Sequence, residues 1–192
     1  MSDENVRCAV SALRGQRFNL DDVRVPTGAG LFAIYGTEET WKALGLNDCD
    51  GRPLYVGKAE VSLHSRDLRA HFSSGKTGQS TVRRSLAALL RDALQLTPSY
   101  RHPERRERAT HYGLEAPGDD QLTEWMGANL KIAFWDKPAA CENLADVERA
   151  VIDTCHPPLN LKDNESPWKE RVAAARRAMA TDLSNRTPDA AT

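Results

Sequence analysis

Residues 53–78 read PLYVGKAEVSLHSRDLRAHFSSGKTG, and this stretch decides how the rest of the chain is interpreted. It begins with the apolar residues Leu54, Tyr55 and Val56, which are typical of a strand, and Gly57 breaks the run. The spacing that follows predicts an amphipathic helix, yet a tyrosine, a lysine, two arginines and two histidines fall within residues 55–71. A helix that only covers a core does not need so many polar groups, so this segment is the first candidate for a functional site.

Apolar runs elsewhere in the chain predict the partners of this segment. GLFAIYG at 30–36 is bounded by glycines and predicts a buried strand, which we expect to pair with a strand at 52–57 as an antiparallel hairpin. LKIAFW at 130–135 predicts a third strand. Periodic apolar positions predict helices at about 4–13, 61–72, 82–95, 121–129, 142–155 and 167–183, with a helical turn inside 37–51.

Residues 96–120 do not fit this pattern. They are polar, carry three prolines and have no periodicity, so they predict a long loop inserted into the domain. Such a loop in a compact domain is usually functional or disordered.

Composition limits the class of protein. A chain of 192 residues with 40% hydrophobic residues and a net charge of −1 suits one globular domain. No apolar stretch of 18 residues is present, so we expect neither a membrane span nor a signal peptide. The four cysteines are scattered without a CxxC pair, which favours a reducing cytoplasm over a disulfide framework or a structural zinc site.

The charge is unevenly distributed along the chain. Residues 51–110 hold twelve Lys or Arg against five Asp or Glu, a net charge of +7, which leaves −8 for the remainder. A basic block of this kind indicates either a surface for a polyanion or a solvated helix face.

Glu148 stands out in the predicted helix at 142–155. It lies four residues after Leu144, three before Val151 and four before Ile152, so its neighbours on the helix surface are apolar. Burying an ionised carboxylate is costly unless a cation or several donors meet it. Two interpretations follow: a glutamate at the core edge paired with an arginine, or a ligand for a hard cation such as Mg²⁺ in a cleft.

Taken in order, these motifs resemble the GIY-YIG nuclease family. Tyr55-Val56-Gly57 matches the YIG element, and Lys58 follows as it does in the repair excinuclease branch. Leu63-His64-Ser65-Arg66 matches the Leu-x-x-Arg of the family, and His71-Phe72 matches the pair that closes the same helix. Glu148 falls at the position of the metal-binding glutamate, and Asn160 follows at the Glu-to-Asn interval of the family.

The resemblance covers residues 30–162 and implies a mixed α/β (α+β) fold, with a small three-stranded antiparallel sheet flanked by helices. On this basis residues 1–29 are an N-terminal extension, residues 96–120 are the insertion, and residues 163–192 are a C-terminal helix and tail.

Two positions depart from the family pattern. The GIY triplet aligns with Gly30-Leu31-Phe32, so a phenylalanine stands in place of the tyrosine; Tyr35 is kept as a candidate, although strand alternation places it on the opposite face. The interval from Tyr55 to Arg66 is one residue longer than usual, so Arg69 is the alternative catalytic arginine.

The implied activity is hydrolysis of DNA phosphodiester bonds by a Mg²⁺- or Mn²⁺-dependent endonuclease. Glu148 would hold the metal, Arg66 would brace the developing charge, and Tyr55, its pKa lowered by Lys58, would deprotonate the attacking water. His71 would orient a phosphate or assist proton transfer; the alternative is a histidine at the helix end that only forms a hydrogen bond with the backbone. Asn160 would brace the region around Glu148; the alternative is a residue that only forms a turn.

The expected partner is DNA, and no membrane is expected as a partner. The sequence leaves open whether the protein acts as a monomer or as a homodimer. Beyond the catalytic groups, the basic residues expected to contact DNA are Arg69, Lys76, Arg83, Arg84, Arg91, Arg105 and Arg106. The alternative function is a non-catalytic DNA-binding protein that retains the fold. A small-molecule enzyme is a third class, but the chain has no Gly-rich phosphate loop or nucleophile elbow to support it.

Overall fold

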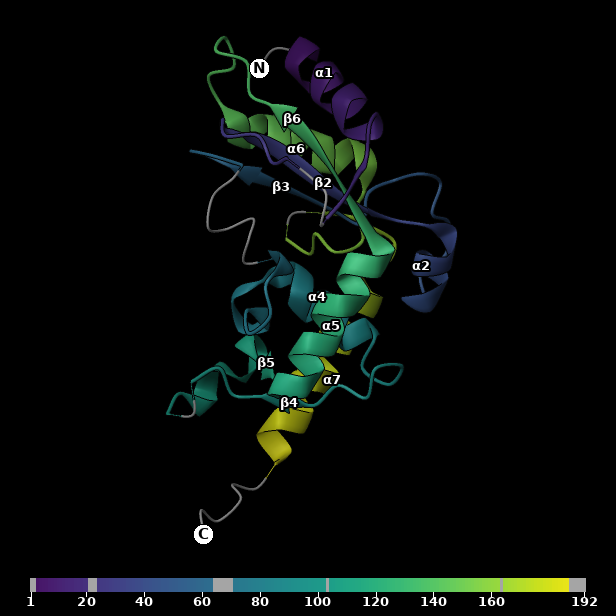
Figure 1. Ribbon diagram of the computed structural model, residues 1–192, viewed down its shortest axis with the longest axis vertical. Coiled ribbons are helices and arrows are strands. Elements are labelled where there is room, and N and C mark those ends of the chain that lie inside the picture. Colours follow the sequence, from purple (N-terminus) through teal and green to yellow (C-terminus); the bar gives the residue numbers. More distant parts are fainter. Residues whose placement is uncertain (1–2, 21–23, 64–70, 103, 163, 187–192) are drawn as a thin grey trace.

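A four-stranded antiparallel sheet lies at the centre of the protein, whose computed structural model describes residues 3–20, 24–63, 71–102, 104–162 and 164–186 (Figure 1). The order across the sheet is β1-β6-β2-β3, so β3 is an outer strand. The strands are β1 (Phe18–Asn19), β2 (Gly30–Gly36), β3 (Tyr55–Ala59) and β6 (Leu130–Asp136). The mixed α/β class is confirmed, with one strand more than the three expected, because the two residues of β1 are too few to show an alternating pattern.

The hairpin of β2 and β3 forms as predicted. Gly30 pairs with Ala59 and Ile34 with Tyr55, in antiparallel register. β3 begins at Tyr55 and not at Arg52, because the Arg52 N–H closes a turn on Cys49 and Pro53 has no N–H to donate.

Helices cover both faces of the sheet, which explains why β2 is apolar throughout. Leu31, Ala33 and Tyr35 face a cluster formed with α1 (Asp3–Arg14) and α6 (Leu144–Cys155). Phe32 and Ile34 alternate with them and face the larger cluster on the other side. That second layer consists of α2 (Glu38–Ala43), α4 (Thr81–Leu89), α5 (Ala116–Asn129) and α7 (Lys169–Asn185), with a 3₁₀ turn η1 (Thr77–Gln79) before α4.

Residues 96–120 are not the irregular loop that the sequence predicts. They form a short hairpin of β4 (Pro98–Ser99) and β5 (Gly113–Leu114), with the 3₁₀ segment η2 (Arg106–His111) between the two strands. Tyr112 anchors the segment: its ring is fully buried and its hydroxyl donates to the Arg84 carbonyl at 2.7 Å. α5 begins at Ala116, earlier than predicted, because a proline is well accommodated in the first turn of a helix.

The C-terminal helix α7 packs into the same core as α4 and α5. Val172 and Met179 are fully buried, and Arg91 beyond α4 forms an ion pair with Asp182 at 2.9 Å. Within the described part of the chain, no helix has both the length and the apolar character needed to cross a membrane.

Candidate active site

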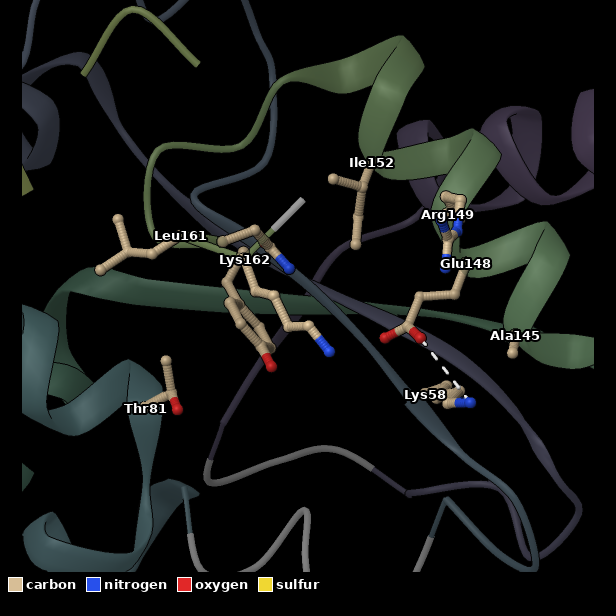
Figure 2. A pocket seen from close by; sticks show the side chains of 10 residues that line it. Lys58, Thr81, Ala145, Glu148, Arg149, Ile152, Leu161 and Lys162 are labelled. Atoms are coloured by element: carbon tan, nitrogen blue, oxygen red, sulfur yellow. Dashed lines mark ion pairs between the residues drawn. The ribbon is translucent and has the colours of Figure 1, made fainter. Parts of the chain in front are cut away.

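A pocket of about 430 Å³ opens beside the outer strand β3, where that strand meets α6 (Figure 2). Its walls come from both sides of the sheet: β3, α6, the segment after α6, and the first residue of α4. The lining residues are Tyr55, Lys58, Thr81, Ala145, Glu148, Arg149, Ile152, Asn160, Leu161 and Lys162. Three residues predicted from widely separated motifs, Tyr55, Glu148 and Asn160, therefore lie around one cavity.

Helix α6 places Glu148 at the edge of its buried stripe. Asn143 caps the helix by accepting hydrogen bonds from the Ala145 and Asp146 N–H groups, and Val147 and Val151 are buried against the sheet. Glu148 follows Val147 by one residue, and its side chain is only 21% exposed. The partial burial that the spacing predicts is therefore present, and the carboxylate faces the pocket (Figure 2).

The cation nearest to Glu148 among the described ion pairs is a lysine and not an arginine. Lys58 Nζ lies 3.9 Å from Glu148 Oε2 and 2.6 Å from Glu60 Oε1, so one ammonium group stands between two carboxylates. Burial raises the pKa of Glu148; the Lys58 ammonium lowers it, the Glu60 carboxylate raises it, and a hydrogen bond with the Lys58 backbone lowers it. The balance is a raised pKa, which shows that the positive charge at this position only partly offsets burial.

Tyr55 borders the pocket from the face of the sheet opposite α6. Its ring packs against Phe32, with centroids 6.0 Å apart, and against His71 at 5.9 Å. Burial, followed by the Glu148 carboxylate, raises the pKa of Tyr55 to about 12. The sequence predicts the opposite direction, with Lys58 as the activating cation. The structure places that ammonium beside Glu60 and Glu148, on the α6 side.

Phe32 occupies the position where the GIY motif has its tyrosine, and it helps to fix Tyr55. It pairs directly with Gly57 across the β2–β3 hairpin. A Cβ atom at position 57 would lie 2.6 Å from Phe32 Cζ and 2.9 Å from Tyr55 Cε1. The glycine of the YVG element therefore makes room for both rings.

His71 packs against the Tyr55 ring and is not among the residues that line the pocket. Its Nδ1 is 2.7 Å from Ser80 Oγ, and its ring also packs on Phe32, with centroids 5.7 Å apart. Ser80 is the N-cap of α4 and accepts a hydrogen bond from the Arg83 N–H. His71 thus connects the start of α4 to the aromatic cluster around Tyr55.

Asn160 is a brace for β3. Its Oδ1 accepts from the Val56 N–H at 2.9 Å, and its Nδ2 donates to the Val56 carbonyl at 2.8 Å. The Leu159 N–H also donates to the Leu54 carbonyl at 2.9 Å. The segment after α6 therefore satisfies polar backbone groups on the outer strand, next to Tyr55.

Tyr35 is not at the pocket, so its place among the catalytic candidates is corrected. It is buried on the α1 side of the sheet, its hydroxyl donates to the Leu13 carbonyl at 2.8 Å, and the Arg17 guanidinium carbon lies 3.8 Å from its ring centroid. Strand alternation accounts for this placement, since Tyr35 is three residues from Phe32.

Two of the expected DNA contacts are buried and are corrected as well. Arg83 is 0% exposed; it forms an ion pair with Asp119 and donates to Thr77 Oγ1 and Thr123 Oγ1. Arg84 is 6% exposed and donates to the Gly78 carbonyl at 2.8 Å. α4 is covered on nearly every side, so its arginines are parts of the interior and not of a solvated face.

The other basic residues expected to contact DNA differ in their exposure and in their partners. Arg91 is held by Asp182, Lys76 is half-buried, and Arg105 and Arg106 are exposed, with Arg106 over the Tyr100 ring at 5.6 Å. Most of the predicted helix at 61–72, including Arg66 and Arg69, lies outside the described residues.

Among the polar residues that line the pocket, Thr81, Arg149 and Lys162 were not predicted as site residues. Arg149 follows Glu148 directly, but its spacing of seven residues from Glu142 and three from Asp146 favours the polar, solvent-facing side of the helix. Lys162 follows Asn160 by two residues, and this proximity to a motif residue is the signal that could have identified it. Figure 2 shows the side chains of Lys162 and Glu148 extending into the same space from different segments.

Comparison with known proteins gives one match. The model of the GIY-YIG catalytic domain matches residues 38–179, which include Tyr55, Glu148 and Asn160. The match begins after β2, so the strand that carries Phe32 in place of tyrosine lies outside it. No curated protein matches the chain, and no solved structure does.

Proposed function

Because the chain belongs to the GIY-YIG catalytic domain family, a family of nucleases, we propose that it is a DNA endonuclease that depends on a divalent metal ion. The observation that carries the proposal is the meeting of Glu148, Tyr55 and Lys58 at one pocket beside the outer strand of the sheet. This pocket unites the YVG element with a carboxylate about ninety residues downstream.

The donor set of the pocket fits a hard divalent cation. Mg²⁺ prefers oxygen ligands and commonly takes one or two carboxylates, with phosphate oxygens and water completing its coordination. Glu148 supplies a half-buried carboxylate whose raised pKa reflects incomplete charge compensation. No cluster of three or more His, Cys, Asp or Glu able to hold a metal occurs among the described residues, so substrate oxygens and water would have to complete the coordination. When bound there, the metal would act as a Lewis acid on the scissile phosphate.

The basic residues around Glu148 suit a phosphate group. Lys58, Arg149 and Lys162 bring three cationic side chains to the lining of one pocket. We propose that they orient the phosphodiester, together with Arg66, or Arg69 in its place, from the segment outside the described residues.

Tyr55 is the proposed acceptor of the proton from the attacking water. Its pKa of about 12 means that it holds its own proton in the free protein at neutral pH. A divalent cation held at Glu148 would favour the phenolate by offsetting the nearby negative charge. His71 would fix the position of Tyr55 through its ring, and Asn160 would do so through Val56.

A second candidate function is DNA binding without turnover. Two observations favour it: Phe32 removes one motif hydroxyl, and the pKa of Tyr55 is raised and not lowered. In either case the proposed backbone contacts among the described residues are Lys76, Arg91, Arg105 and Arg106, while the buried Arg83 and Arg84 no longer are. Arg69 also stays a proposed contact, from the segment outside the described residues.

Incubation of the purified protein with supercoiled plasmid tests the proposal. We expect nicked or linear product with Mg²⁺ or Mn²⁺ and none with EDTA. Linear product formed without a nicked intermediate would indicate a homodimer that cuts both strands. Parallel reactions on modified and branched DNA would define the substrate. Binding without cleavage on every substrate and with both metals would support the non-catalytic alternative.

A further inference from the structure

A second, smaller pocket lies on the segment between β4 and β5. It has a volume of about 40 Å³ and is lined by Tyr100, Arg101, His102, Arg105, Arg108 and His111. Three arginines and two histidines around so small a space form a lining suited to an anion. Among the described ion pairs, the only carboxylate that meets a lining residue is Glu104, 3.6 Å from His102.

A buried guanidinium lies close to this pocket. Arg84 is 6% exposed, and its Nε is buried without a hydrogen-bond partner among the described groups. Its Nη1 donates to the Gly78 carbonyl at 2.8 Å, and the same carbonyl receives Arg101 Nη1 at 3.5 Å. Two guanidinium groups therefore converge on one oxygen atom, and one of them belongs to the pocket lining.

The positive charges of Arg84 and of the arginines near it repel one another. Burial, followed by the neighbouring Arg176, lowers the pKa of Arg84 to about 10, with Arg101 also lowering it and Tyr112 opposing them. Arg84 stays protonated at neutral pH, because its pKa remains well above 7. The pKa of His111 is lowered by burial and then by Arg84, Arg176, Arg108 and Arg101. Cations gathered at this density favour the binding of an anion, which would relieve their repulsion.

A chain of contacts through Arg84 connects the smaller pocket to the candidate active site. Thr81 lines the larger pocket, and its Oγ1 lies 3.4 Å from Arg84 Nη2. Arg84 in turn shares the Gly78 carbonyl with Arg101, which lines the smaller pocket. The two pockets are thus separated by the first turn of α4 and one arginine pair.

We infer that the arginine pocket, defined by Arg101, Arg105, Arg108 and His111, binds a backbone phosphate of the DNA some nucleotides away from the phosphate at Glu148. The inference rests on the proposed function for the identity of the polyanion. Such a contact carries no sequence information; it fixes the position of the strand across the start of α4. A substrate must then span both pockets to be held in register.

Salt-dependent DNA binding, measured in EDTA so that no cleavage occurs, tests this inference. The variant Arg101→Gln/Arg108→Gln removes two exposed cations of the pocket and keeps the Cβ and Cγ methylene groups of each side chain. Arg7→Gln/Arg171→Gln removes the same charge from exposed positions on α1 and α7 and serves as the matched control. Arg101→Lys/Arg108→Lys keeps the charge, and thermal unfolding verifies that every variant is folded.

We expect the slope of log K against log[salt] for a duplex of about 30 base pairs to decrease in magnitude by about 1 for the pocket variant, since one lost phosphate contact removes about 0.9. The control should keep the slope of the parent, and the lysine variant should restore it. An unchanged slope in the pocket variant, or an equal loss in the control, would overturn the inference. If the slope changes as expected and the plasmid assay shows no cleavage, the phosphate site stands and the nuclease proposal falls.

Discussion

Asn160 forms hydrogen bonds with both backbone polar groups of Val56, accepting from its N–H at 2.9 Å and donating to its carbonyl at 2.8 Å. The two residues are 104 positions apart in the chain. They join the strand that carries the YVG element to the segment that follows α6. The relative position of Tyr55 and Glu148 therefore depends on this pair of hydrogen bonds.

The first prediction concerns this brace. Asn160→Ala should lower the free energy of unfolding by about 2 kcal/mol, since two hydrogen bonds to a buried strand are lost at about 1 kcal/mol each. Urea denaturation measures the change. Asn129→Ala, which removes a bond from Nδ2 to the Trp125 carbonyl within one helix, is the control and should cost less. If Asn160→Ala and the parent unfold at the same urea concentration, the bracing role is wrong.

A second prediction distinguishes a buried arginine from a DNA contact. Arg83→Met should destabilise the protein by about 3–5 kcal/mol, because Asp119 is left buried without its cation. Arg91→Met breaks the half-exposed pair with Asp182 and should cost about 1 kcal/mol or less. Thermal or urea unfolding provides both values. A stable Arg83→Met protein with a reduced salt dependence of DNA binding would restore Arg83 to the DNA surface.

The contrast between these two arginines shows where sequence reasoning fails. Apolar runs and glycine boundaries were enough to predict β2 and β6, and helical spacing was enough to predict a partly buried Glu148. Arg83 looked like a surface cation because its partner, Asp119, lies 36 residues away in a segment that was predicted to be a loop. Charge counts along the chain carry no information on such tertiary pairing.

The position of Tyr35 was within reach of the sequence, whereas the environment of Tyr55 was only partly so. Strand alternation alone places Tyr35 opposite Phe32, as the structure shows. The expectation that Lys58 lowers the pKa of Tyr55 used only their separation along the chain. Strand alternation, had it been applied past Gly57, would have placed Lys58 on the face opposite Tyr55, and Glu60 is only two residues from Lys58. The approach of Glu148, which also holds the ammonium on the α6 side, is tertiary and could not be included.

The third prediction tests Tyr55 as the proton acceptor. With a pKa of about 12, its phenolate fraction rises about tenfold per pH unit near neutrality, so the cleavage rate of the parent should increase between pH 7 and 9. Tyr55→Phe should cleave far more slowly and lose this dependence. Tyr35→Phe, a matched substitution on the other face, should keep the same pH profile. A pH-dependent rate that persists in Tyr55→Phe would assign the base to another group.

The fourth prediction uses the raised pKa of Glu148 as a signature of metal binding. Because the folded pKa lies above the unfolded one, ionised Glu148 destabilises the fold; the effect is absent below the unfolded pKa and grows as pH rises through the folded pKa. At pH 7 and without metal, Glu148→Gln should therefore unfold at a higher temperature than the parent, and the difference should vanish near pH 4 and below.

Addition of Mg²⁺ should change this order. The parent gains stability from a ligand that binds only the folded state, and Glu148→Gln should gain little. Thermal unfolding with and without Mg²⁺ measures both effects. Asp153→Asn, which removes an exposed carboxylate from the same helix, should respond to Mg²⁺ as the parent does. An equal response of Glu148→Gln and the parent would place the metal elsewhere.

The most direct test of the central claim is plasmid cleavage by Glu148→Gln beside Asp153→Asn, at equal protein and Mg²⁺ concentrations. Both substitutions remove one negative charge from α6, but only Glu148 lines the pocket. We predict that Glu148→Gln loses cleavage by a factor of about 10² or more while it still binds DNA, and that Asp153→Asn cuts as the parent does. Cleavage by Glu148→Gln at the rate of the parent would contradict the assignment of this pocket as the active site.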